Sequence, residues 1–335
     1  IVTSTRLTHA TPAALYAHSP ERNWEDDSSV PAPAQAAGCR DIAAQLLDPR
    51  QGDGPEVMLG GGRANFLPVA EGGRRRDGRD LLASWVANGD LRHLIHTRQE
   101  LLDTDSDGQL LGVFSDSHLP YEQLRDEQTT APNLREMTEA ALDRLSASQE
   151  GYLLMVEGGR IDHAHHEGVA GRALSELVAF DEAIAATLAR VDLRETLVLV
   201  TADHSHVLAM AGYPTRNNPI LGLVVGNDPA GNPLETPAVD AEGTPYTTLG
   251  YLNGPGAVDG GERPVPETGP EAVQHALIAT GYVDSRGESV LSETHAGEDV
   301  VLYAGGPWAH LARGVMEQNL IFDLITWAYG WSPSP

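Results

Sequence analysis

The sequence alternates between short apolar runs and longer segments in which apolar residues recur every three or four positions. The short runs are rich in leucine and β-branched residues, as buried strands are, and lie at residues 1–6, 56–59, 94–96, 111–114, 152–156, 196–201 and 300–304. The longer segments have the spacing of amphipathic helices and lie at residues 35–47, 80–87, 133–146, 171–191 and 309–329. Because strands and helices alternate, the pattern predicts an α/β fold with a mainly parallel sheet.

Two stretches add to this pattern. Thr11 and Pro12 predict a helix start, with Thr11 as the N-cap and Pro12 in the first turn. Residues 212–270 are rich in glycine, proline and asparagine and show little periodicity. Such a composition is typical of a long surface excursion or a small subdomain.

Titratable residues follow the end of the strand predicted at 152–156. Glu157 comes first, a Gly-Gly pair breaks the strand, and Asp162 and His166 follow. A helix that begins near residue 161 would place Asp162 and His166 on one face, where a carboxylate and an imidazole can bind one ion. Oxygen and nitrogen ligands together suit zinc, and Glu157 could serve a harder ion such as magnesium. A strand end followed by a solvated polar loop would show the same residues.

A second strand end repeats this design. The run at 196–201 continues into Ala-Asp-His-Ser-His at 202–206, so Asp203 and His204 also follow a strand. Open α/β sheets place their ligand sites at the carboxyl ends of the strands. The repetition favours a metal site over a solvated loop.

The formal charge of −26 limits the partners of the protein. It argues against nucleic acids and anionic membranes, because both bind basic surfaces, and no apolar run approaches the roughly 18 residues of a membrane span. The sequence contains arginine but no lysine. A GC-rich coding bias explains the missing lysine but not the acid excess, which favours adaptation to high salt.

Cys39 is the one cysteine of the sequence, so it cannot form an internal disulfide. It is a buried small apolar residue, an unpaired thiol, or half of a bridge to another segment.

With these residues assembled, the sequence resembles the alkaline phosphatase family, in its animal-like branch more than its enteric bacterial branch. The resemblance rests on Val-Glu-Gly-Gly-Arg-Ile-Asp-His-Ala-His-His-Glu at 156–167, Thr-Ala-Asp-His-Ser-His at 201–206 and Glu-Thr-His-Ala-Gly-Glu-Asp-Val at 293–300. Further matches are Thr-His-Ala-Thr-Pro-Ala-Ala at 8–14, Arg-Asn-Trp at 22–24 and Gly-Pro-Trp-Ala-His-Leu at 306–311. His9 and His163 indicate the animal-like branch. The resemblance implies a single three-layer α/β sandwich over residues 1–335, with residues 212–293 as a crown-like insert.

The resemblance also implies a role for each site residue. Two zinc ions and one magnesium ion would be bound: the first zinc by Asp162, His166 and His295, the second by Asp203 and His204, and magnesium by Glu157 and Thr11. Arg22 would clamp two phosphate oxygens, for which a planar guanidinium is suited. His9 and His163 would support the magnesium side without binding the ion, and His165 and His206 would be structural or supporting residues.

The family's serine nucleophile and one bridging aspartate are expected upstream of residue 1. The strand-like first residues and Cys39, whose counterpart in the animal-like branch pairs with an upstream cysteine, favour an absent N-terminal segment. Several serines of the chain lack the helix-start context of an activated nucleophile: Ser28, Ser29, Ser106, Ser117 and Ser285.

The resemblance implies hydrolysis of small phosphate monoesters through a phosphoserine intermediate, in a periplasmic or secreted homodimer. One alternative is a non-catalytic metal-binding fragment or subunit that lacks the nucleophile. A second is a phosphodiesterase or sulfatase of the same superfamily. A sulfatase would need a modifiable cysteine, and Cys39 lies in a helical context without that motif.

Overall fold

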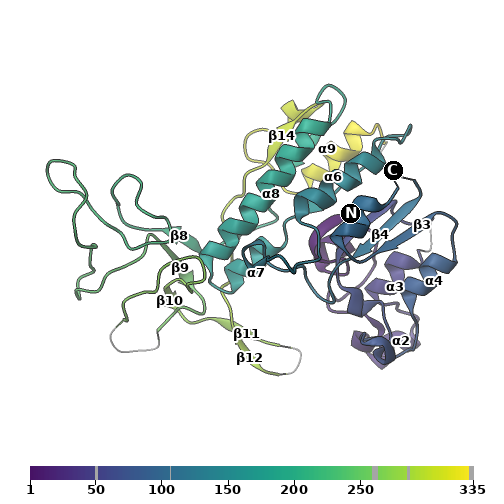
Figure 1. Ribbon diagram of the computed structural model, residues 1–335, viewed down its shortest axis with the longest axis horizontal. Helices are drawn as coiled ribbons and strands as arrows, with labels where there is room; N and C mark the ends of the chain where they lie inside the picture. Colours follow the sequence, from purple (N-terminus) through teal and green to yellow (C-terminus); the bar gives the residue numbers. More distant parts are fainter. Residues whose placement is uncertain (50–51, 106, 259–262, 285–286, 332–335) are drawn as a thin grey trace. The chain divides into compact units, whose positions relative to one another are not determined.

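The computed structural model describes residues 1–49, 52–105, 107–258, 263–284 and 287–331 (Figure 1). The chain folds into two compact units. The first unit is Ile1–His163 with Arg172–Thr187, and the second is Ala164–Gly171 with Leu188–Pro335.

A five-stranded parallel sheet forms the centre of the first unit, in the order β3-β4-β2-β1-β5. Its strands are β1 Val2–Arg6, β2 Val57–Gly61, β3 Arg92–Ile95, β4 Gln109–Val113 and β5 Val156–Glu157. In the register of β1, Val2 lies opposite Leu59 on one side and Val156 on the other. The sheet confirms the predicted α/β class with its mainly parallel central sheet.

Helices cover both faces of this sheet (Figure 1). Along β2, Leu59 belongs to a core that includes Met137 of α6, whereas Met58 belongs to a second core that includes Trp85 of α4. This alternation explains why the strand runs are apolar throughout: each strand is buried on both faces. The helices of the first unit are α1 Ala10–Ala13, α2 Ala32–Ala36, α3 Ile42–Leu47, α4 Leu81–Ala87, α5 Arg98–Asp103 and α6 Leu134–Leu145.

Two helices carry residues of both units. They are α7 Arg160–His166 and α8 Ala170–Arg190. Among its described residues, the second unit also contains short strands and the α-helix α9. They are β6 Val198–Val200, β7 Ser205–His206, β8 Leu208–Met210, β9 Leu249–Asn253, β10 Ala276–Ile278, β11 Gly281–Val283, β12 Ser289–Leu291, β13 His295–Ala296, β14 Tyr303–Gly305 and α9 Leu320–Ala328.

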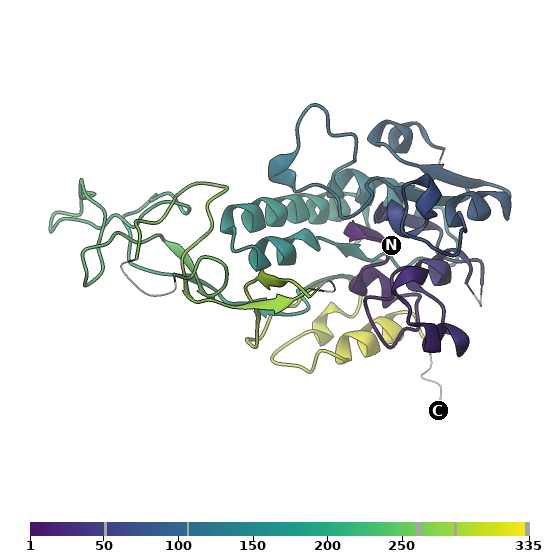
Figure 2. The same ribbon diagram turned by 90° about the horizontal axis from the view of Figure 1, so that it is seen from below.

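The predicted insert at residues 212–293 contains β9 to β12 and long connecting turns, seen as the green segments in Figure 2. Residues 259–262 and 285–286 of this region lie outside the described residues. The role of the region as a crown-like insert within a single domain stays a prediction. Among the described residues, no helix is long and apolar enough to span a bilayer.

The start of α1 corrects one prediction. Thr11 is not the N-cap: His9 occupies that position, and Thr11 is an exposed residue of the helix. The chain already turns at the end of β1, where the N–H of His9 donates to the carbonyl of Arg6 at 2.9 Å. The helix therefore begins before the Thr-Pro pair.

Two predicted helices are interrupted. Residues 35–47 do not form one helix, because α2 ends at Ala36 and Gly38 adopts a positive φ of 86° before Asp41 caps α3. Residues 309–329 are also divided, and only α9 and a 3-10 turn at Ala309–Leu311 are helical there. Gly314, with a φ of 68°, lies between them.

Two predicted strands are shorter than their apolar runs. Of residues 152–156, only Val156 belongs to β5. The run at 196–201 gives β6, which pairs antiparallel with β14, with Val200 opposite Tyr303. Among the described residues, β6 is therefore not a strand of the parallel sheet.

A buried arginine ties the loop that precedes α4 to the rest of the first unit. Arg75 is 1% exposed. Its guanidinium contacts Asp41 at 2.9 Å and Asp77 at 2.6 Å. Asp41 also caps α3, by accepting from the N–H of Ala44 at 2.9 Å. A buried cation with two carboxylate partners satisfies its hydrogen bonds, and removing it leaves those carboxylates without a counter-charge.

We predict that Arg75→Met destabilises the chain by about 3 to 5 kcal/mol, because Asp41 is left buried without its cation. Urea unfolding followed by tryptophan fluorescence measures the change. The matched control is Arg76→Met at the exposed neighbouring position, where a shift of no more than about 0.5 kcal/mol is expected. Equal shifts for the two variants would contradict the proposed role of the buried ion pairs.

Glu176 of α8 is a buried carboxyl in the first unit. It is 4% exposed and accepts a hydrogen bond from the backbone N–H of Glu122 at 2.6 Å. Burial raises the pKa of Glu176 to about 7, and the nearby Glu122 carboxylate also raises it. The folded pKa of Glu176 lies above that of an unfolded glutamate. The contribution of Glu176 to the free energy of unfolding is therefore fully present below about pH 4.5. That contribution is lost as the pH rises through 7.

Glu176→Gln should therefore stabilise the chain at pH 8 by about 2 to 3 kcal/mol and change little at pH 4. Glutamine keeps an oxygen that can accept from Glu122. Thermal unfolding at the two pH values tests this, with the exposed Glu150→Gln as the control for a lost negative charge. A stability difference between Glu176→Gln and wild type that does not change with pH would refute the assignment.

Candidate metal centre

Helix α7 carries two of the predicted ligands one turn apart. It spans Arg160–His166, and Gly158 and Gly159 separate it from β5. Asp162 and His166 are therefore at positions i and i+4 of one helix, as the sequence predicts. Asp162 belongs to the first unit and His166 to the second.

Glu157 lies at the carboxyl end of β5, beside β1. Its register partner is Thr3, and the hydroxyl groups of Thr3 and Thr5 both donate to its Oε2, the latter at 3.1 Å. The two threonines are fully buried and also contact each other, with 2.8 Å between their Oγ1 atoms. The strand pairing thus fixes the carboxylate that the sequence assigns to magnesium.

Arg22 lies beside His9 in the first unit. One guanidinium nitrogen of Arg22 is 3.3 Å from Nε2 of His9. Because a guanidinium can only donate, this Nε2 accepts, and the ring proton is on Nδ1. That Nδ1 is buried and has no hydrogen-bond partner among the described residues. Arg22 itself is exposed, as a residue that binds a substrate must be.

Three imidazoles of the first unit gather into one cluster, named here the first histidine group: His9, His118 and His163. Each offers a nitrogen, and these nitrogens lie within 4.8 Å of one another. The ring centres of His118 and His163 are 4.3 Å apart, and His9 lies 5.3 Å from each. His9 and His163 are predicted supporting residues, whereas sequence reasoning missed His118.

Burial and nearby arginines keep these imidazoles neutral. Burial, together with Arg6 and Arg22, lowers the pKa of His9 to about 4. Burial and Arg160 lower the pKa of His163 to about 3. The same causes, with Arg6 as the nearest charge, lower the pKa of His118 far below its usual range. A neutral imidazole can accept a hydrogen bond or bind a metal ion, whereas an imidazolium can do neither.

A buried carboxylate, Glu25, anchors the arginine behind this group. Glu25 is 9% exposed and accepts from Arg6 through both oxygens, at 2.6 and 2.7 Å. It also accepts from Thr8 at 2.6 Å and Asn65 at 3.0 Å. The remaining guanidinium nitrogen of Arg6 contacts Nε2 of His118, and the backbone N–H of Arg6 lies 3.3 Å from Nδ1 of the same ring.

Glycines at the end of β2 allow the loop that carries His118 to approach. The N–H of Gly62 donates to the carbonyl of Ser117 at 2.8 Å. A Cβ on Gly61 would lie 2.0 Å from that same carbonyl oxygen, so any side chain there would displace the loop. The Gly-Gly-Gly sequence that closes the strand is therefore required for packing around the first histidine group.

Four imidazoles of the second unit form a cluster, named here the second histidine group: His166, His204, His206 and His295. The rings of His204 and His295 are stacked with 3.7 Å between their centres. β13 pairs with β7, and this pairing sets His295 opposite His206. The structure thus brings together three of the predicted zinc-binding histidines, His166, His204 and His295, with His206 among them. Asp203, the remaining predicted ligand of this unit, lies 3.3 Å from Nε2 of His204.

The second histidine group fits zinc. His166 Nδ1 lies 2.8 Å from the carbonyl oxygen of Glu293, so Nδ1 donates and Nε2 keeps its lone pair. This Nε2 is 3.1 Å from Nε2 of His295. Two imidazole nitrogens bound to one tetrahedral zinc, each about 2.0 Å from it, lie about 3.3 Å apart. The observed spacing therefore suits a shared zinc ion.

Glu293 is the residue of this unit that sequence reasoning did not single out. It is 2% exposed, and its carboxylate contacts His206 at 2.7 Å. Burial would raise its pKa, but hydrogen bonds from His166, His206 and the backbone N–H of Val207 lower the pKa to about 2. Its place two residues before His295, inside a motif already recognised, was the signal available in the sequence.

The serines set aside as nucleophiles have other contacts where the structure describes them. Ser28 Oγ donates to Asp26 at 2.6 Å in the turn after Arg22, and Ser117 Oγ lies 3.5 Å from Arg6. Ser106 and Ser285 lie outside the described residues. Cys39 is exposed and forms no disulfide among the described residues, so a bridge to another segment stays a prediction.

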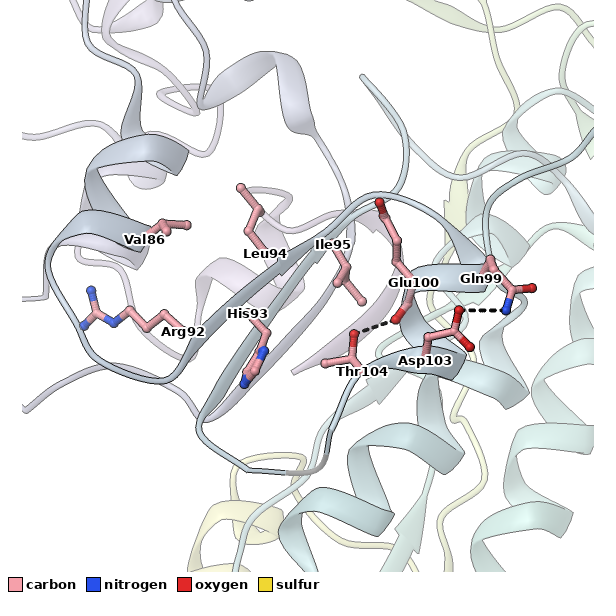
Figure 3. Close-up of a pocket in the computed structure, with 9 residues that line it drawn as sticks. All are labelled: Val86, Arg92, His93, Leu94, Ile95, Gln99, Glu100, Asp103 and Thr104. Atoms are coloured by element: carbon pink, nitrogen blue, oxygen red, sulfur yellow. Dashed lines mark hydrogen bonds between the residues drawn. The ribbon is translucent and has the colours of Figure 1, made fainter.

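A pocket of about 510 Å³ in the first unit contains none of the predicted site residues. It lies between β3 and α5 and includes Arg92, His93 and Glu100 (Figure 3). Its polar groups are engaged locally: Gln99 donates to Asp103 at 2.9 Å, and Thr104 to the carbonyl of Glu100 at 2.5 Å.

Comparison with known proteins identifies the family. The sequence profile of the alkaline phosphatase family matches residues 1–331. The tissue-nonspecific alkaline phosphatase isozyme of Felis catus is 41% identical over 98% of this chain and 62% of its own length. The alkaline phosphatase of Gadus morhua is 38% identical over 98% of this chain and 68% of its own length. This chain belongs to the alkaline phosphatase family.

Solved structures agree on the fold. The alkaline phosphatase of the Antarctic bacterium TAB5 matches 99% of this chain and 72% of its own, with a TM-score of 0.61 and 20% identity. The Thermus thermophilus alkaline phosphatase matches 64% of this chain and 40% of its own, with a TM-score of 0.52 and 39% identity. This chain spans 62% of the length of the Felis catus relative and 63% of that of the Gallus gallus isozyme.

Proposed function

We propose that this chain supplies the metal-binding and phosphate-binding residues of an enzyme that hydrolyses phosphate monoesters. Membership of the alkaline phosphatase family supports the reaction. The observation that carries the metal assignment is the pair of Nε2 atoms, on His166 and His295, that face each other at 3.1 Å.

The ligand assignment is the one that the resemblance to the family implies. Two zinc ions and one magnesium ion are proposed, held by these residues: Asp162, His166 and His295 for the first zinc, Asp203 and His204 for the second, and Glu157 with Thr11 for magnesium. When bound, the zinc ions would supply Lewis-acid stabilisation of the attacking and leaving oxygens of an in-line displacement.

Arg22 is the proposed phosphate clamp. Its planar fork can donate to two phosphoryl oxygens at once, which a lysine cannot do in the same geometry. His9 accepts from Arg22 and so restricts where the guanidinium lies. Behind it, the ion pair of Arg6 with Glu25 fixes His118, whose ring packs against His9. The clamp is thereby held by packed, hydrogen-bonded groups and can meet the phosphate with little reorganisation.

The proposed reaction proceeds through a phosphoserine intermediate, in which a serine attacks phosphorus and the alcohol leaves. No serine of this sequence is assigned as that nucleophile. A chain that binds the metals and does not turn over substrate is therefore the second candidate.

The assembly and setting are also proposals. We expect a homodimer in which residues 212–293 take part, and a periplasmic or secreted location, as the resemblance to the family implies. The charge of −26 without lysine supports solubility at high salt.

The test is hydrolysis of p-nitrophenyl phosphate by the full chain at alkaline pH, with zinc and magnesium. Activity that a chelator abolishes and that added zinc restores would mean that a nucleophile is supplied, by a segment outside this sequence or by a serine to which no role is assigned here. Asp162→Asn should lower the rate at least 100-fold, because an amide is a poor substitute for a zinc-binding carboxylate. Asp181→Asn, the same change at an exposed position of α8, should leave the rate unchanged.

The outcomes separate the two candidates. Chelator-sensitive activity that Asp162→Asn removes supports the hydrolase. Bound zinc with no turnover supports the non-catalytic metal-binding chain, and activity that the chelator does not affect excludes the metal mechanism.

A further inference from the structure

We propose that Glu293 is a positioning residue for the zinc-binding histidines. Its carboxylate acts through His206, whose Nδ1 is 2.7 Å away, and not through His166, whose Nδ1 is 3.5 Å from the same oxygen and 2.8 Å from the carbonyl of Glu293. The inference deepens the proposed function and rests on it for the identity of the metal. It assigns a role to a buried carboxylate and to a histidine that are not themselves among the proposed ligands.

The carboxylate of Glu293 is fully buried and held at both oxygens. Oε1 accepts from the backbone N–H of Val207 at 2.8 Å, and Oε2 lies 2.7 Å from Nδ1 of His206. The backbone N–H of Glu293 in turn donates to the carbonyl of His166 at 3.0 Å. A buried carboxylate with a hydrogen bond at each oxygen has one orientation available to it.

This contact selects the tautomer of His206. An ionised carboxylate can only accept, so Nδ1 of His206 carries the proton and donates it to Glu293. In the neutral ring, Nε2 then has the lone pair. Histidines near metal ions have their ring nitrogens assigned in this way by a carboxylate or carbonyl on the far side.

His206 contacts every other ring of its group. Its ring centre lies 5.2 Å from that of His166 and 5.3 Å from those of His204 and His295, and all three contacts are edge-on. On another side it stacks on His165 at 4.7 Å. A rotation of the His206 ring would therefore displace His166, His204 or His295, which are the proposed zinc ligands.

The same short segment orients the ligands directly. The carbonyl of Glu293 accepts from His166, and His295 follows two residues later in β13, opposite His206 of β7. This segment thus supplies one proposed ligand, His295, and the carbonyl that fixes a second, His166. It also supplies the carboxylate that fixes the ring of His206, which contacts both. If Glu293 served only to anchor the chain at the end of β7, its hydrogen bond from Val207 would be sufficient. The additional bond to His206 therefore indicates a role at the metal site.

The experiment compares the zinc affinity of the full-length wild-type chain with that of Glu293→Gln, by competition with a chromogenic chelator. We expect a 10- to 100-fold weaker affinity in the variant, the usual effect of removing a partner behind a metal-binding histidine. Glutamine has nearly the same size, but its NH₂ group would donate to Nδ1 and reverse the tautomer of His206. Glu288→Gln is the matched control, with the same change of charge at an exposed position five residues earlier, and should bind zinc as wild type does.

A second measurement reads the tautomer directly. Long-range ¹⁵N–¹H spectra of the metal-free wild-type chain, with His206 assigned from a His206→Gln variant, should show the proton on Nδ1. Glu293→Gln should move it to Nε2. A role limited to anchoring the loop would change thermal stability but would not move the proton. This measurement decides the question in the wild type even if Glu293→Gln fails to fold.

The double variant Glu293→Gln/His206→Gln completes the test. If Glu293 acts through His206, the double variant should bind zinc no more weakly than His206→Gln alone. Unchanged zinc affinity in Glu293→Gln, additive losses in the double variant, or a proton on Nε2 of wild-type His206 would each overturn the proposal. Zinc binding without hydrolysis of a phosphate ester would refute the proposed reaction, and the comparison of affinities would still decide the role of Glu293.

Discussion

A buried carboxylate behind each histidine group is the constraint on which the site depends. Glu25 in the first unit and Glu293 in the second are both removed from water, which is unfavourable for a charge without partners. Each is compensated by hydrogen bonds, from Arg6, Thr8 and Asn65 in one case and from His206 and Val207 in the other. Two of the residues that stabilise these charges also contact the histidine groups: Arg6 contacts His118, and the ring of His206 contacts those of His166, His204 and His295. The same interactions therefore stabilise the buried carboxylates and orient the histidines of the site.

Much of the arrangement could be predicted because it is local in sequence. Apolar runs buried on both faces predicted the parallel strands, and Met58 and Leu59 face different cores as such a strand requires. The four-residue spacing of Asp162 and His166 predicted one helix, and α7 contains both. Glu157 was expected at a strand end and lies there, in register with Thr3.

Other features depend on contacts between distant parts of the chain. His118 contacts His9 because the loop that carries His118 packs against the glycines at the end of β2. The residues next to either histidine in sequence do not predict this contact. Glu25 follows Arg22 by three residues, but its role depends on hydrogen bonds from Arg6 and Asn65, which are distant from it in sequence. Local signals also gave wrong helix boundaries. The turn from Arg6 to His9 starts α1 ahead of Thr11. Gly38 and Gly314, with positive φ angles, interrupt segments whose apolar spacing is helical.

The central claim is that the histidines of the second unit hold zinc, with their nitrogens oriented from behind by Glu293. X-ray absorption at the zinc edge of the metal-loaded chain tests it most directly. The account predicts a shell of nitrogen and oxygen at about 2.0 Å and the outer-shell scattering of two or more imidazole rings. A sulfur shell at about 2.3 Å, which would place zinc on the exposed Cys39, or a shell without imidazole scattering would contradict it.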